Sequence, residues 1–162
     1  MITADRVREL LNYDPDTGMF TWIKKASRKI VVGKIAGCKT KAGYIVIGID
    51  GVIYYAHQLA WLWMTGETAP QIDHEKGDRI DNRWNRLREA THQQNVFNSK
   101  LAKNSTSGFK GVSWHKRAGK WSAQYNINGR KKHLGLFENA DDAHAAYISA
   151  VRAIHPEFVR AS

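Results

Sequence analysis

Short apolar runs separated by turn signals characterise the first half of the chain. Residues 3–12 predict a helix, because Val7, Leu10 and Leu11 share one face and Thr3 is a suitable N-cap. The same reasoning predicts a turn at 14–18, a strand at 19–22, a hairpin of strands 44–49 and 52–55, and a helix at 57–64. Helices and short strands are interspersed, which indicates an α+β fold.

The last third of the chain predicts three antiparallel strands, at 109–116, 121–127 and 131–137. Asn128-Gly129 is a typical hairpin turn between the second and third strands. Along the second strand, apolar residues at odd positions alternate with Ser122, Gln124 and Asn126 at even positions. One face of this sheet is therefore expected to be apolar and the other polar and basic.

A helix capped by Asn139 follows these strands, and Pro156 marks its end. Its apolar stripe consists of Ala143, Ala146, Tyr147, Ala150 and Ile154. The small residues allow close packing on the apolar sheet face, so we expect one helix against a three-stranded sheet. Trp114, Trp121 and Tyr147 are expected in this core.

Charge narrows the class of partner. The 162 residues carry 25 Lys and Arg against 15 Asp and Glu, which gives a net charge of +10. Residues 1–56 and 105–162 hold most of the excess, at +4 and +5, whereas residues 57–104 carry +1. Such an excess favours a polyanionic partner, and the six Trp favour nucleic acid over a membrane surface. A merely basic, solvated surface is the alternative.

Several classes are excluded or disfavoured by composition. A single cysteine, Cys38, excludes an internal disulfide framework and a zinc site built on paired cysteines. Charged residues near the N-terminus argue against a signal peptide, and no apolar run is long enough to span a membrane. We therefore expect a cytoplasmic protein with no membrane partner.

The densest group of reactive side chains lies between residues 71 and 100. Asp73 and His74 follow Ile72 on an expected strand, and Thr91 begins a helix with a capping box that places His92 and Asn95 on roughly one face. A carboxylate and an amide oxygen suit a hard divalent cation, and an imidazole can take a proton from water near neutral pH. Adjacent residues of a strand point to opposite faces, however, so Asp73 and His74 share a site only if the strand is bent or frayed.

These residues resemble the HNH endonuclease family, which has a ββα-metal fold. The motifs are Asp73-His74, the Asn-rich segment 81–88, and Thr91-His92 followed by Asn95, preceded by the segment 55–61 typical of phage members. The resemblance implies that His74 is the general base and that Asp73 and Asn95 hold one Mg²⁺ or Mn²⁺. Asn85 would brace the loop between the strands, with Asn82 as a competitor for that role.

Other residues of the segment have weaker assignments. His57 is interpreted as packed or phosphate-facing, and His92 as exposed or phosphate-facing, with metal binding as the less favoured role of each. Four arginines could be a solvated face or could position phosphates, and beside a nuclease site we favour the second: Arg79, Arg83, Arg86 and Arg88.

The C-terminal third resembles the APETALA/ethylene-response-factor DNA-binding domain, which reads DNA through a three-stranded sheet. The matching motifs are 110–112, 119–123, 133–137 and the alanine-rich pattern at 140–147. The resemblance implies that DNA is contacted by Lys110, Ser113, His115, Arg117, Gln124, Asn126, Lys131 and His133. Ser113, His115 and Asn126 replace family arginines, so the GC-rich target of the plant family is not expected.

These resemblances define the predicted organisation. Residues 1–56 form a helix and hairpin region, 57–102 the HNH nuclease core, 103–108 a linker, and 109–162 the DNA-binding domain. The resulting hypothesis is a metal-dependent DNA endonuclease from a phage or mobile element, acting in the bacterial host cell and targeted by its C-terminal domain. It nicks or cuts double-stranded DNA as a monomer or a dimer, and a homing endonuclease is one form.

Two other functions stay open at this stage. The chain is a sequence-specific DNA-binding regulator if its HNH portion is an inactive scaffold. An RNA-directed protein is less favoured because the aromatic residues are needed in the cores.

Overall fold

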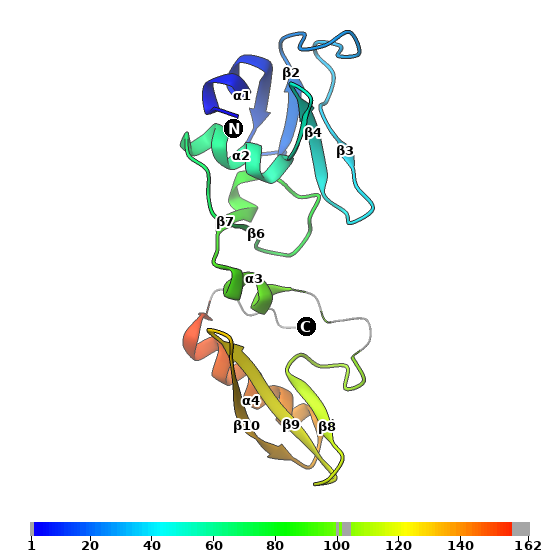
Figure 1. Ribbon diagram of the computed structural model, residues 1–162, viewed down its shortest axis with the longest axis vertical. Helices are drawn as coiled ribbons and strands as arrows, with labels where there is room; N and C mark the ends of the chain where they lie inside the picture. The colour runs from blue at the N-terminus through cyan, green and yellow to red at the C-terminus, as the bar shows by residue number, and fades with distance from the viewer. Residues whose placement is uncertain (1, 100, 102–104, 157–162) are drawn as a thin grey trace. The chain divides into compact units, whose positions relative to one another are not determined.

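The computed structural model describes residues 2–99, 101 and 105–156, and it divides into two compact units (Figure 1). The N-terminal unit is Met1–Ala90 and the C-terminal unit is Thr91–Ser162. Each unit is described by itself below. Of the predicted linker at 103–108, Lys103 and Asn104 lie outside the described residues.

The N-terminal unit combines two helices with three small antiparallel sheets. Its elements are α1 (Ala4–Leu10), β1 (Leu11–Asp14), β2 (Met19–Trp22), β3 (Cys38–Lys39), β4 (Ile45–Ile49), β5 (Val52–Tyr55), α2 (Ala56–Thr65), β6 (Ile72–His74), the 3₁₀ helix η1 (Trp84–Arg86) and β7 (Leu87–Glu89). The sheets are β1-β2, β3-β4-β5 and β6-β7.

Local sequence explains the start of this unit. The Thr3 side chain accepts a hydrogen bond from the Arg6 amide, so it caps α1 as expected. The helix ends at Leu10, two residues before the predicted end, because Leu11 is extended and pairs with Trp22 as the first residue of β1. Val7, Leu10 and Leu11 are nevertheless all buried in one core, which also contains Phe20, Ile47 and Leu59.

The turn between β1 and β2 packs directly on the loop that precedes η1. The Tyr13 hydroxyl donates to the Asn82 carbonyl oxygen at 2.6 Å, and the Trp84 amide donates to the Pro15 carbonyl at 3.0 Å. Gly18 has a φ of 74° and lies against the backbone of Asn82 and Arg83 with no room for a side chain. The turn therefore fixes the position of the 82–84 backbone.

The C-terminal unit contains a short helix and a sheet covered by a long helix. Its elements are α3 (His92–Asn98), β8 (Val112–His115), β9 (Lys120–Ile127), β10 (Arg130–Phe137) and α4 (Ala140–Ile154). The three strands form an antiparallel sheet in the order β10-β9-β8, and α4 runs along one face of it (Figure 1). The predicted α+β class, with a three-stranded antiparallel sheet packed on one helix, is confirmed.

Packing against α4 follows the predicted alternation. Val112 and Ala123 from the sheet are buried with Ala143 of α4. Val151 is also buried, although it was not part of the predicted stripe, because it packs with Tyr147 and Phe97. The expectation that Trp114 is in the core is wrong. Trp114 is 47% exposed, because it lies on the edge strand β8 and is covered on one side by the Trp121 ring.

No helix in the described ranges has the length and apolar content that a membrane crossing requires.

Candidate active site

The Asp73-His74 pair lies on the short strand β6, which pairs with β7. The register places Asp73 opposite Arg88 and His74 opposite Leu87. Arg88 donates from Nη2 and Nε to Oδ2 of Asp73, at 2.8 and 3.0 Å. Asp73 is 7% exposed, so this carboxylate is removed from bulk water and held by a guanidinium.

His74 is the last residue of β6, and its side chain has different partners from those of Asp73. Its Nε2 lies 3.3 Å from Oδ1 of Asn82, and the His57 ring packs edge-on against its ring with centroids 4.9 Å apart. The His74 side chain is buried. Burial lowers its pKa, while the Asn82 hydrogen bond and three nearby carboxylates, chiefly Asp73, oppose that shift. His74 is therefore neutral at neutral pH.

His57, in the first turn of α2, completes a cluster of aromatic rings around His74. We define the imidazole cluster as the rings of His57, His74, Tyr44 and Tyr55. The centroids of neighbouring rings in this cluster lie 4.9–6.1 Å apart. Burial, with a smaller contribution from His74, lowers the pKa of His57 to about 3. Its Nδ1 is buried and has no hydrogen-bond partner within the described residues. These facts favour the packed role for His57.

Of the two candidate bracing asparagines, Asn82 is the one that contacts His74. Asn82 is 3% exposed and its Nδ2 donates to the Ile80 carbonyl at 3.0 Å, which directs Oδ1 toward His74. Asn85 lies on η1 with an exposed side chain. The loop that Asn82 occupies is the one held by Tyr13 and Gly18, so the β1-β2 turn supports the site indirectly.

The four arginines each have a partner inside the N-terminal unit. Arg83 pairs with Asp81 and lowers the pKa of that carboxyl, and Arg86 lies 3.4 Å from Glu75. Arg79 donates to the Ala42 carbonyl and lies over the Tyr44 ring, 4.8 Å from its centroid. Arg88 holds Asp73, as described above. The four arginines thus form ion pairs, hydrogen bonds or ring contacts with residues at and around the site, and they are not a uniformly solvated face.

The remaining predicted site residues of the nuclease motif belong to the C-terminal unit. Thr91 caps α3 and forms the predicted capping box with Gln94. His92 is exposed and Asn95 is half-buried on this helix. Asp73 is in one unit and Asn95 in the other, so their joint binding of a metal ion stays a prediction.

The chemistry of the donor set fits the expected metal. Asp73 and Asn95 offer one carboxylate and one amide oxygen, which suit a hard ion such as Mg²⁺ or Mn²⁺ that keeps several waters. Within the described ranges, no three His, Cys, Asp or Glu side chains are grouped as ligands of one ion would be. Arg88 already forms an ion pair with Asp73, so the carboxylate has a cationic partner within its own unit.

The second set of predicted residues lies on the sheet of the C-terminal unit. The register pairs Lys131 with Asn126 and His133 with Gln124, on the face opposite α4. Gln124 is half-buried. The following members of the set are exposed: Ser113, His115, Arg117, Asn126, Lys131 and His133. The sheet thus presents a polar, basic face. Lys110 differs, because its Nζ donates to the Phe97 carbonyl of α3 at 2.9 Å.

Sequence reasoning missed two residues that shape the site, Tyr13 and Tyr44, and one contact, the pairing of Arg88 with Asp73. The strand register creates the last of these contacts, because it places Arg88 of β7 opposite Asp73 of β6, and neither short strand has an apolar pattern that would predict this pairing. Tyr44 lies directly before β4, and its ring contacts those of His57 and His74, about 13 and 30 residues further along the chain, so no local motif marks it.

Comparison with known proteins supports the nuclease motif. Residues 54–97 match the HNH endonuclease family. The chain is also 32% identical over 89 residues to Protein 3.8 of Escherichia phage T7, a match that covers 55% of this chain and 73% of that protein. No solved structure matches the chain. Residues 54–97, which contain Asp73 and His74, therefore form an HNH endonuclease domain, and the chain belongs to one family with Protein 3.8.

Proposed function

We propose that the chain is a metal-dependent DNA endonuclease in which His74 is the general base. The observation that carries the proposal is a buried imidazole, held by Asn82, directly after a buried carboxylate in the segment that matches the family. Burial of two polar side chains costs free energy unless they are paired. Here both are paired, Asp73 with Arg88 and His74 with Asn82, and buried titratable groups held in this way cluster at functional sites.

The chain's own residues can prepare water for attack. With Nε2–H donating to Oδ1 of Asn82, the accepting lone pair of His74 is on Nδ1, and a neutral imidazole can take a proton from water at neutral pH. Asn82 holds the ring in orientation and tautomer. Asp73 and Asn95 would hold one Mg²⁺ or Mn²⁺, which when bound supplies positive charge to the scissile phosphate and the 3′ leaving oxygen.

We further propose that the C-terminal sheet targets the nuclease to double-stranded DNA. The support is the exposed face opposite α4, which carries Gln124, Asn126, Lys131 and His133 side by side through the register. Side chains of these types bond base edges and phosphates, and a small sheet can enter a major groove. A phage or mobile-element origin, including a homing endonuclease, is consistent with the phage relative.

The first test measures conversion of supercoiled plasmid to open circles with Mg²⁺ or Mn²⁺. We expect wild-type protein to cleave and His74→Ala to lose at least 100-fold in rate, because general-base catalysis is worth about 10²–10⁴-fold. His144→Gln on α4 also removes a partly buried imidazole and is the matched control, expected to cleave at the wild-type rate. DNA binding without cleavage in any divalent ion would instead favour the regulator hypothesis.

The same assay assigns the bracing asparagine. Asn82→Ala removes the hydrogen bond to His74, whereas Asn85→Ala changes an exposed side chain. We expect the Asn82 variant to show the larger loss of cleavage rate at saturating DNA. The reverse order would return the role to Asn85.

A further inference from the structure

The helix α3, which carries Asn95, is built into the C-terminal unit through its buried face. Phe97 is 4% exposed and packs with Tyr147 and Val151 of α4. Tyr125 and Leu134 of the sheet complete this cluster. A seven-residue helix is too short to be stable alone in water, so its conformation depends on this packing.

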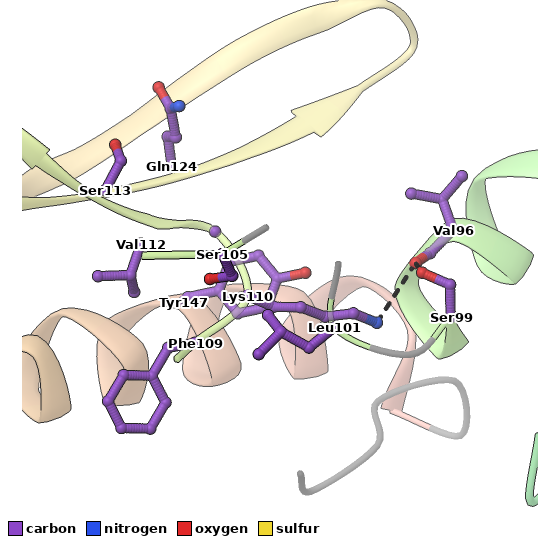
Figure 2. Close-up of a pocket in the computed structure, with 11 residues that line it drawn as sticks. Val96, Ser99, Leu101, Ser105, Phe109, Lys110, Val112, Ser113, Gln124 and Tyr147 are labelled. Carbon is purple, nitrogen blue, oxygen red and sulfur yellow. Dashed lines mark hydrogen bonds between the residues drawn. The ribbon is translucent and has the colours of Figure 1, made fainter. Parts of the chain in front are cut away.

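Lys110 holds the C-terminal end of the same helix. Its Nζ donates to the carbonyl oxygen of Phe97 at 2.9 Å and to that of Val96 at 3.5 Å. Figure 2 shows the bond to Val96 and the Lys110 side chain, which lines a pocket of about 420 Å³. The last carbonyls of a helix lack partners within the helix and carry its negative dipole end. The Val96 carbonyl also accepts from the Ser99 amide and hydroxyl, so the main contribution of the Lys110 ammonium is a partner for the Phe97 carbonyl and a positive charge at the negative end of the helix dipole.

The backbone that carries Lys110 is itself fixed. Gly111 has a φ of 68°, and a side chain at this position would meet the Tyr147 ring and the Gln124 carbonyl. The Gln124 amide donates to the Gly111 carbonyl at 2.8 Å. The backbone at Lys110 is therefore fixed by the sheet and α4, and its position does not depend on α3.

The N-terminal end of α3 has a second attachment. The Asn128 amide, in the β9-β10 turn, donates to Oε1 of Gln93 at 3.4 Å. Both ends of the helix that presents Asn95 are thus connected to the proposed DNA-reading sheet.

We infer that Lys110 is a positioning residue of the nuclease, which fixes the Asn95 helix on the sheet, and is not a phosphate contact. This inference rests on the proposed function for the role of Asn95. It assigns the C-terminal unit a second task, because the sheet that reads DNA also supports a helix of the catalytic motif.

The test compares full-length wild type, Lys110→Met and Lys110→Arg. Met keeps most of the aliphatic stem and loses the donors, whereas Arg keeps positive charge and donors. We measure amide hydrogen exchange in α3, DNA affinity at several salt concentrations without a divalent ion, and single-turnover cleavage over a Mg²⁺ titration. Lys131→Ala, on the open face of β10, is the control for a true DNA contact.

For Lys110→Met we expect about tenfold faster exchange in α3, DNA affinity within twofold of wild type, and slower cleavage that requires more Mg²⁺. Lys110→Arg should recover part of the exchange protection. Lys131→Ala should weaken DNA binding, reduce the salt slope by about one, and leave α3 exchange unchanged.

Unchanged α3 exchange in Lys110→Met, combined with weaker binding and a smaller salt slope, would overturn the inference and make Lys110 a phosphate contact. If wild type does not cleave, the proposed function fails, yet exchange and binding still decide the role of Lys110. Circular dichroism of Lys110→Met, with Lys110→Arg as the second variant, separates loss of the helix contact from general unfolding.

Discussion

At the scale of single residues, burial acts on His57 and His74 in the same direction. Each imidazole is more than nine-tenths buried, and charging either one would place a cation beside the other ring. The pKa of both is therefore lowered, that of His57 to about 3. The fold keeps the imidazole cluster neutral, which suits a base that must accept a proton and also makes the cluster sensitive to acid.

The pH dependence of stability follows from the His57 shift. In the unfolded chain a histidine has a pKa near 6.5, so between about pH 6.5 and 3 the unfolded state binds a proton that the folded state does not. Stability should therefore fall as the pH falls through this window, by up to about 1.4 kcal/mol per pH unit from His57.

Thermal or urea unfolding between pH 7 and 4.5 measures this dependence. The variant His57→Gln removes the titrating group, so its stability should decline less steeply with acid than that of wild type, whatever its absolute stability at pH 7. Parallel pH profiles of the two proteins would show that His57 is protonated equally in the folded and unfolded states, contrary to this account.

At the scale of elements, the β1-β2 turn acts as a support for the catalytic loop. Gly18 is required there for two reasons, its positive φ and its contact with the backbone of Asn82 and Arg83. Gly51, in the β4-β5 turn, has a similar φ of 80° but open space around it. Gly18 therefore must satisfy both a positive φ and a close backbone contact, whereas Gly51 must satisfy the positive φ alone. A comparison of the two positions separates the two effects.

Gly18→Ala should lower the free energy of unfolding by roughly 2–5 kcal/mol, since left-handed backbone costs about 1–2 kcal/mol and overpacking adds about 1–3. Gly51→Ala should lose only the first contribution, about 1 kcal/mol. Urea unfolding of both variants provides the comparison, with cleavage as a second readout. Equal losses would mean that the turn does not press on the 82–84 loop.

The elements that could be predicted from sequence are those with local causes. Asp50-Gly51 and Asn128-Gly129 form turns with positive φ at both residues, and the caps at Thr3, Thr91 and Asn139 are present. The contacts that join the elements could not be predicted. The Arg88–Asp73 pair depends on a register between distant strands, and the exposure of Trp114 depends on its place at a sheet edge.

The position of α3 is a further case in which local pattern was insufficient. Its capping box was evident, but its membership of the C-terminal unit depends on Phe97, whose partners Tyr147 and Val151 are about 50 residues away in sequence. The residues of the HNH motif therefore identify the candidate catalytic side chains, but they do not show which packing contacts fix the position of the helix α3 that carries Asn95.

At the scale of the whole molecule, the charge excess is concentrated outside the nearly neutral residues 57–104. The N-terminal 56 residues have nine basic and five acidic residues, and residues 105–162 have nine and four. Basic segments attract DNA through its phosphates without sequence preference. In the proposed function the polar sheet face adds base contacts, and the proposed catalytic residues Asp73, His74 and Asn95 lie in a segment without a large excess of basic side chains.

The number of proposed active sites in one chain predicts the order in which the cleavage products form. One chain contains one His74 cluster, and one cluster can attack one phosphate in each event, so a monomer should nick a single strand. On supercoiled plasmid we expect open circles to accumulate first and linear DNA to follow slowly, with a rate that is first order in protein. A time course on agarose gels at several protein concentrations measures both features. Linear DNA formed directly, with a rate that rises as the square of protein concentration, would instead require two chains acting together on the two strands.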